Sequence, residues 1–220
     1  MGQESGIIGI IKTGPKERLK MEQKPKYSTT IKSMPLLYIE LKKAASLKLQ
    51  GFNDCEIINK SLRDNIFQVN TESRKKEIAA AIIKRLKILD NYLTIKLVNG
   101  SMETSKQVAL YALMKTDQLF FEFMLEVYRE QILFHNLVIK DSHFSIFFQR
   151  KSEQSETVAS WGDYTHYKLK QVYKRVLREA GFAKRQKKTM AITRPVMDFE
   201  LVEHLKKTGD SRYLEAMLGE

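Results

Sequence analysis

The sequence of 220 residues contains few of the residues that cross-link chains or bind metals. Its one cysteine, Cys55, has no partner for an internal disulfide, so nothing in the sequence indicates an oxidising compartment. The four histidines lack the spacing of zinc ligands. There is no Gly-rich phosphate loop, no serine nucleophile elbow and no acidic cluster typical of a two-metal nuclease. We therefore expect a protein without metal, cofactor, small-molecule substrate or enzymatic activity.

Long apolar runs are absent as well. The most apolar stretch, residues 119–125, is short and contains Glu122, whereas a membrane-spanning helix needs about 20 apolar residues. The apolar run at residues 7–11 is shorter still, and its flanking charges do not suit a signal peptide. The sequence predicts a cytoplasmic protein with no membrane partner.

Proline is missing between Pro35 and Pro195, and glycine is rare in the same region. Because each would weaken a helix interior, their scarcity predicts an all-α protein. Residues 1–26 are predicted to be a flexible tail, either native or an added extension, before a helical domain over 27–220. The apolar spacing and the capping residues predict helices over 36–49, 53–67, 73–89, 104–116, 117–134, 143–151, 163–180, 198–207 and 212–218, and a short segment over 91–98. The helices over 104–116 and 117–134 could form one continuous helix. At most one short extended segment is expected, near 189–193.

Positive charge is concentrated in one segment of the chain. The formal net charge is +12, and residues 160–195 hold ten Lys or Arg but only two acids, Asp163 and Glu179. An apolar stripe on the helix predicted to begin at an Asp163 N-cap leaves the basic residues on the opposite face. Unpaired like charges on one face favour a polyanionic partner over an ordinary solvated surface. The candidate nucleic-acid-binding residues are Lys168, Lys170, Lys174, Arg175, Arg178, Lys184, Arg185, Lys187, Lys188 and Arg194.

Aromatic residues accompany this segment. Tyr164, His166 and Tyr167 could hydrogen-bond or stack on a nucleic acid, but packing is the stronger interpretation for Tyr167, Tyr173 and Trp161. A second basic cluster lies on the helix predicted over 73–89, where a binding role and a plain solvated face are equally supported. It comprises Arg74, Lys75, Lys76, Lys84 and Lys87, together with Arg85.

Several diffuse patterns over residues 27–220 resemble the BrxA family of BREX bacteriophage-defence systems. They lie at residues 27–32, 50–54, 71–76, 110–113, 121–128, 160–161, 175–182 and 209–219. The resemblance implies an all-helical fold similar to the NusB family, with two small packed subdomains of roughly 27–100 and 101–220. It also implies double-stranded DNA binding without enzymatic activity, in company with other BREX proteins.

The sequence leaves three hypotheses for function. The first is binding of double-stranded DNA, largely through phosphate contacts from the basic helical face. The second is a protein-interaction adaptor that docks an acidic partner within the defence complex. The third is RNA binding, which rests only on analogy with the NusB fold.

Overall fold

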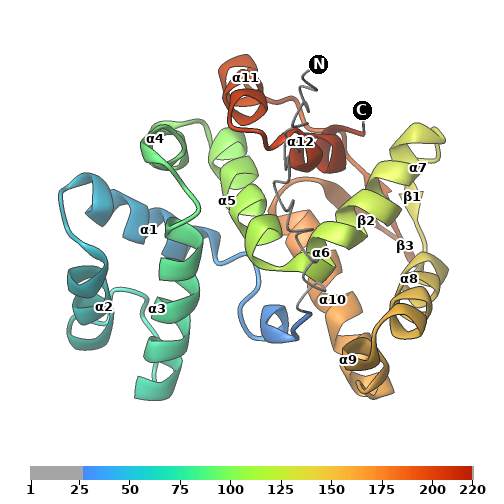
Figure 1. Cartoon of the computed structure of the whole chain (residues 1–220), viewed down its shortest axis with the longest axis horizontal. Coiled ribbons are helices and arrows are strands. Elements are labelled where there is room, and N and C mark those ends of the chain that lie inside the picture. The colour runs from blue at the N-terminus through green and yellow to red at the C-terminus, as the bar shows by residue number, and fades with distance from the viewer. Residues whose placement is uncertain (1–26, 220) are drawn as a thin grey trace, which may run out of the picture.

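The structure is a computed structural model that describes residues 27–219, and it is mostly helical, as predicted (Figure 1). The predicted N-terminal tail, residues 1–26, lies outside the described residues. Within them, no helix is long and apolar enough to cross a membrane.

The first half of the chain forms a short helical turn, which contacts α10 (Asp163–Glu179), and four helices that pack at one end of the molecule (Figure 1). These elements are η1 (Thr30–Lys32), α1 (Tyr38–Leu49), α2 (Asp54–Arg63), α3 (Glu72–Leu86) and α4 (Asn91–Asn99). The predicted capping box is present at the start of α2. The Asn53 side chain accepts from the Glu56 backbone N–H at 3.1 Å, and Glu56 accepts from the Asn53 N–H at 2.8 Å.

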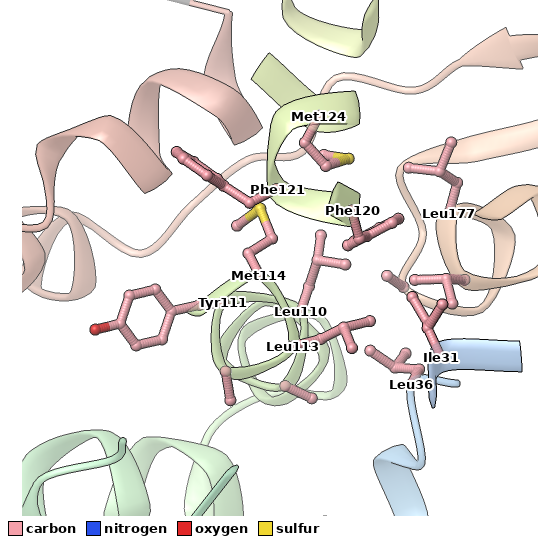
Figure 2. Close-up of a cluster of buried hydrophobic side chains, with 14 of the residues drawn as sticks. Ile31, Leu36, Leu110, Tyr111, Leu113, Met114, Phe120, Phe121, Met124 and Leu177 are labelled. Atoms are coloured by element: carbon pink, nitrogen blue, oxygen red, sulfur yellow. The ribbon is translucent and has the colours of Figure 1, made fainter. Parts of the chain in front are cut away.

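Helix α5 (Met102–Thr116) lies at the centre of the molecule and packs against α1, α3 and α4. Its middle is buried on every side, from Val108 to Met114. Figure 2 shows Leu110 and Leu113 of α5 facing Ile31 and Leu36 of the N-terminal segment. One connected hydrophobic cluster therefore runs through both halves of the described chain, and the division into subdomains near residue 100 stays a prediction.

The helices predicted over 104–116 and 117–134 are present, and they are not continuous, because the first ends at Thr116. Asp117 has an extended backbone, and its side chain accepts from the Phe120 N–H at 2.9 Å, so it caps a new helix. That helix, α6 (Gln118–Phe123), passes through a π-helical turn, η2 (Met124–Tyr128), into α7 (Arg129–Leu133). The remaining helices are α8 (Asp141–Gln154), α9 (Glu156–Ala159), α10 (Asp163–Glu179), α11 (Phe199–Lys207) and α12 (Ser211–Leu218).

A small antiparallel sheet has more strands than predicted. The extended segment expected near 189–193 is strand β3 (Thr189–Ile192), which lies between β1 (Val138–Ile139) and β2 (Ala183–Gln186). Neither neighbour has a sequence signal. Strand β1 has only two residues, and three of the four β2 residues are exposed, so no alternation of apolar and polar residues marks it.

Candidate nucleic-acid interface

Helix α10 carries most of the predicted basic residues. It begins one residue earlier than predicted, because Gly162 holds the N-cap position that was predicted for Asp163, and Asp163 is the first helical residue. Its carboxylate still lies in the first turn, where negative charge stabilises a helix. The helix ends before Gly181, whose φ of +85° is a conformation that glycine adopts without strain. The predicted apolar stripe is buried, and the opposite face of the helix therefore points outward. The buried residues are Leu169, Val172, Tyr173, Val176 and Leu177.

Two of the predicted lysines on α10 share one carboxylate. The Lys170 ammonium lies 3.1 Å from the carboxylate of Asp141, and the Lys174 ammonium pairs with the other oxygen of the same group. Asp141 is the first residue of α8, so these pairs join α8 to α10. The hydrogen bonds from Lys174 and Lys170 lower the pKa of Asp141 despite some burial. The outward residues Lys168, Arg175 and Arg178 are exposed.

The basic residues after α10 form a β-hairpin. Strands β2 and β3 pair in register, with Lys184 opposite Ala191 and Arg185 opposite Met190. Lys187 and Lys188 form the two-residue turn between the strands, and Lys187 has a φ of +47°. The hairpin lies beside α10, which it contacts through β2. Lys184, Arg185, Lys187 and Lys188 are all exposed.

Helix α10 and the hairpin enclose a cavity of about 540 Å³, which we call the hairpin cavity. Five cationic side chains line it, and Asp141 is its one acidic side chain. The lining residues are Asp141, Gln171, Lys174, Arg178, Arg185, Lys187, Lys188, Thr189 and Met190. Sequence reasoning did not find Asp141, because it precedes Lys170 by 29 residues and only the fold brings the two together.

Not every predicted residue faces this cavity. Arg194 is exposed and donates to the backbone carbonyl of Ile132 at 3.3 Å, at the end of α7. Lys168 lies nearer the start of α10, where its ammonium is 5.2 Å from the centre of the Tyr164 ring.

The second basic cluster is engaged largely in local contacts. Arg74 pairs with Glu77 at 3.3 Å and Lys75 with Glu72 at 2.6 Å. The ammonium of Lys87 lies 3.6 Å from the Asp54 carboxylate, and the ammonium of Lys84 donates to the backbone carbonyl of Thr116 at 3.0 Å. Lys76 is exposed.

Arg85 does not belong to that surface, and its assignment to the cluster was wrong. It is buried, and its guanidinium donates to the carbonyls of Leu36 and Met34 at 2.7 and 2.6 Å. Burial lowers the pKa of Arg85 to about 10, and the nearby Asp117 carboxylate opposes this shift. Arg85 therefore ties α3 to the segment that precedes α1.

The aromatic residues of α10 divide into buried and exposed. Tyr173 is fully buried, as predicted, and Trp161 packs against the edge of the core. The packing role predicted for Tyr167 is wrong, because its side chain is half exposed. Tyr164 is even more accessible, with 71% of its surface exposed. The His166 ring stacks on Phe148, with the ring centroids 5.3 Å apart. Tyr164 and Tyr167 project from the outer face of the helix because they fall outside its apolar stripe.

The described residues hold no group of three or more His, Cys, Asp or Glu side chains that could bind a metal ion. The arrangement at the hairpin cavity is thus a set of cationic donors on a helix and a hairpin. Such donors suit the oxygen atoms of phosphate groups.

Two comparisons with known proteins indicate one family, and a third shows a similar fold. The BrxA family model matches residues 25–209. A protein from Bacillus cereus (strain H3081.97), named BREX protein BrxA, is 52% identical over 194 residues, which cover 88% of this chain and 97% of that protein. A crystal structure of an uncharacterized protein from Magnetospirillum magneticum has a similar fold, with a TM-score of 0.76 at 20% identity. That match covers 89% of this chain and the whole of the other.

Proposed function

The chain belongs to the BrxA family, and from this premise we propose that it is a non-enzymatic component of a BREX phage-defence system that binds double-stranded DNA. Phosphate contacts from α10 and the β2–β3 hairpin supply most of the affinity. In this proposal the protein acts in the cytoplasm beside other BREX proteins, and it keeps the NusB-like arrangement that the sequence resemblance implies.

The observation that carries the proposal is the concentration of charge at the hairpin cavity. Five cations meet one carboxylate there, and Asp141 is already bound by Lys170 and Lys174. Arg178, Lys187 and Lys188 have no carboxylate within ion-pair distance among the described residues. Such a surface raises the local concentration of a polyanion and releases its counterions on binding.

The test uses the full chain with three charges removed from the cavity. The variant Arg178→Gln, Lys187→Gln, Lys188→Gln should bind a duplex more weakly regardless of sequence. The slope of log K against log salt should lose roughly 0.9 for each phosphate contact removed. Fluorescence anisotropy with a labelled duplex over a salt series measures both quantities.

The matched control removes the same charge from the C-terminal helices, as Lys206→Gln, Lys207→Gln, Arg212→Gln. These residues are exposed on or beside α11 and α12 and should leave duplex affinity unchanged apart from a small general effect. Equal losses in both variants would contradict a localised surface. Preference for structured RNA over duplex at the same salt would favour RNA binding. A nuclease-resistant complex with an acidic protein, without any duplex binding, would favour the adaptor role.

A further inference from the structure

A second groove lies beside α10, separate from the hairpin cavity, and Lys168 is the one residue that it shares with the predicted basic face of α10. It occupies about 850 Å³ between α10, α3 and the N-terminal segment around η1, and we call it the tyrosine groove. In Figure 1 the short blue helical turn of η1 lies between α3 and α10. The groove is lined by Thr29, Thr30, Lys32, Ser33, Met34, Glu77, Ala80, Ala81, Lys84, Tyr164, Lys168 and Val172. Its volume falls within the roughly 300–1,000 Å³ that is typical of sites for small ligands.

The rim of the tyrosine groove is cationic. Lys32, Lys84 and Lys168 come from three different elements and meet only here. Glu77 is the one acidic side chain in the lining, and Arg74 pairs with it at 3.3 Å. The groove therefore offers an uncompensated positive charge to a bound anion.

Tyr164 stands at this rim with its ring largely uncovered. Its 71% exposure means that it contributes little to the core, and Lys168 lies 5.2 Å from the ring centre. An exposed ring beside an ammonium group is a stacking surface next to a phosphate contact. The neighbouring Tyr167 repeats the pair one helical turn later, with Lys170 at 5.8 Å from its ring.

The floor of the groove is apolar. Met34 and Val172 are buried beneath it, and Ala80 and Ala81 present only methyl groups. A planar, uncharged ring could lie on this floor while its attached phosphate meets the lysines. Bases inside a duplex expose no face for such stacking, because neighbouring bases cover both faces. Bases of a single strand do expose their faces.

We infer that the tyrosine groove binds single-stranded nucleic acid, with an unstacked base against Tyr164 and its phosphates at Lys32, Lys84 and Lys168. This site is separate from the hairpin cavity, and it does not depend on the duplex binding proposed above. It would let the protein hold a strand that has left a duplex.

The experiment compares the full chain with two substitutions at one position. Tyr164→Leu keeps apolar bulk but removes the aromatic face, and it should weaken binding of a labelled oligothymidine of roughly 12 nucleotides by about 5- to 100-fold. Tyr164→Phe keeps the face and should bind like the parent chain. Phe199→Leu is the matched control, because Phe199 is 76% exposed on α11 and distant from the groove in sequence. An abasic strand of the same length should bind the parent as weakly as the oligothymidine binds the Leu variant.

The outcomes distinguish single-strand binding at the tyrosine groove from duplex binding at the hairpin cavity. Unchanged oligothymidine binding by Tyr164→Leu, or equal losses for Phe and Leu, would overturn the inference. The triple hairpin variant, in which Arg178, Lys187 and Lys188 are changed to Gln, gives a further test. If its affinities for the single strand and for the duplex fell by the same factor, the inference would also be overturned. Duplex binding should be unaffected by Tyr164→Leu. If the parent chain bound the single strand but did not bind duplex at all, the proposed function would be overturned and single-strand binding at the tyrosine groove would be supported.

Discussion

Asp141 is a negative charge in a cavity that we propose to bind a polyanion, so its presence needs a reason. Its carboxylate holds Lys170 and Lys174, and it lies in the first turn of α8. Both lysines have about four-fifths of their side-chain surface covered. The carboxylate thus positions α8 against α10 and reduces the repulsion between neighbouring lysines, while it also repels phosphates.

These opposing effects predict the behaviour of Asp141→Asn. Duplex affinity should rise about fivefold, because one charge near the phosphates is worth about 1 kcal/mol in water. The free energy of unfolding should fall by about 1 kcal/mol, because the half-exposed Asp141 carboxylate forms weak ion pairs and an acid in the first turn of a helix contributes little. Anisotropy and urea unfolding measure the two changes.

The pH dependence gives a second readout of Asp141→Asn. The folded pKa of Asp141 is lowered, so its stabilising effect is present above its ordinary pKa and is lost as pH falls through the lower value. The stability difference between parent and variant should therefore shrink in acid. Asp64→Asn is the control, since Asp64 is similarly exposed and pairs with Lys60 at 3.7 Å far from the cavity. An equal gain in DNA affinity for Asp64→Asn would contradict the specific role of Asp141.

The β2–β3 hairpin has a turn residue that conflicts with its backbone conformation. Lys187 has a φ of +47°, which a side chain with a Cβ adopts at a cost of about 1 kcal/mol or more. Glycine or asparagine would be the usual choice at such a turn. A lysine there is understandable if its charge is used, as it is in our proposal.

Two substitutions at Lys187 separate charge from conformation. Lys187→Gly and Lys187→Ala both remove the ammonium, but only glycine relieves the backbone strain. The Gly variant should unfold at higher urea concentration, with a free energy of unfolding about 1 kcal/mol above that of the Ala variant. Both should lose the same duplex affinity, and the same slope in log salt. A larger loss for Ala than for Gly would show that hairpin geometry, and not charge, controls binding.

The elements also show how far the sequence could be interpreted without a structure. The scarcity of proline and glycine predicted the mostly helical fold, and apolar spacing with capping residues predicted most of the individual helices. The stripe from Leu169 to Leu177 correctly identified the buried face of α10. Strand β2 could not be predicted, because its residues are exposed and its pairing with β3 depends on tertiary position. The burial of Arg85 could not be predicted either, because the carbonyls of Met34 and Leu36 that accept its hydrogen bonds are about 50 residues away in the chain.

At the scale of the whole molecule, α10 connects the two sites that we propose, which differ in chemistry. Tyr164 and Arg178 are fourteen residues apart on one helix, which corresponds to roughly 21 Å at 1.5 Å per residue. The tyrosine groove flanks its beginning and the hairpin cavity flanks its end. The sequence predicted the five cations of the hairpin cavity but not Asp141. It did not predict the tyrosine groove, because Lys32, Lys84 and Lys168 lie far apart in the chain.

A substrate with both a duplex and a single-stranded tail should therefore engage both sites at once. Once the duplex is bound, the tail experiences an effective concentration near the millimolar range, so the junction should bind at least about tenfold more tightly than either arm alone. Tyr164→Leu should reduce junction affinity to that of the duplex arm, and the triple hairpin variant to that of the strand. Competition assays with tails of either polarity measure this, with an abasic tail as the control. The duplex and the single strand could each bind alone while the junction bound no more tightly than the duplex. That result would mean that one substrate cannot occupy both sites of one protein molecule at the same time.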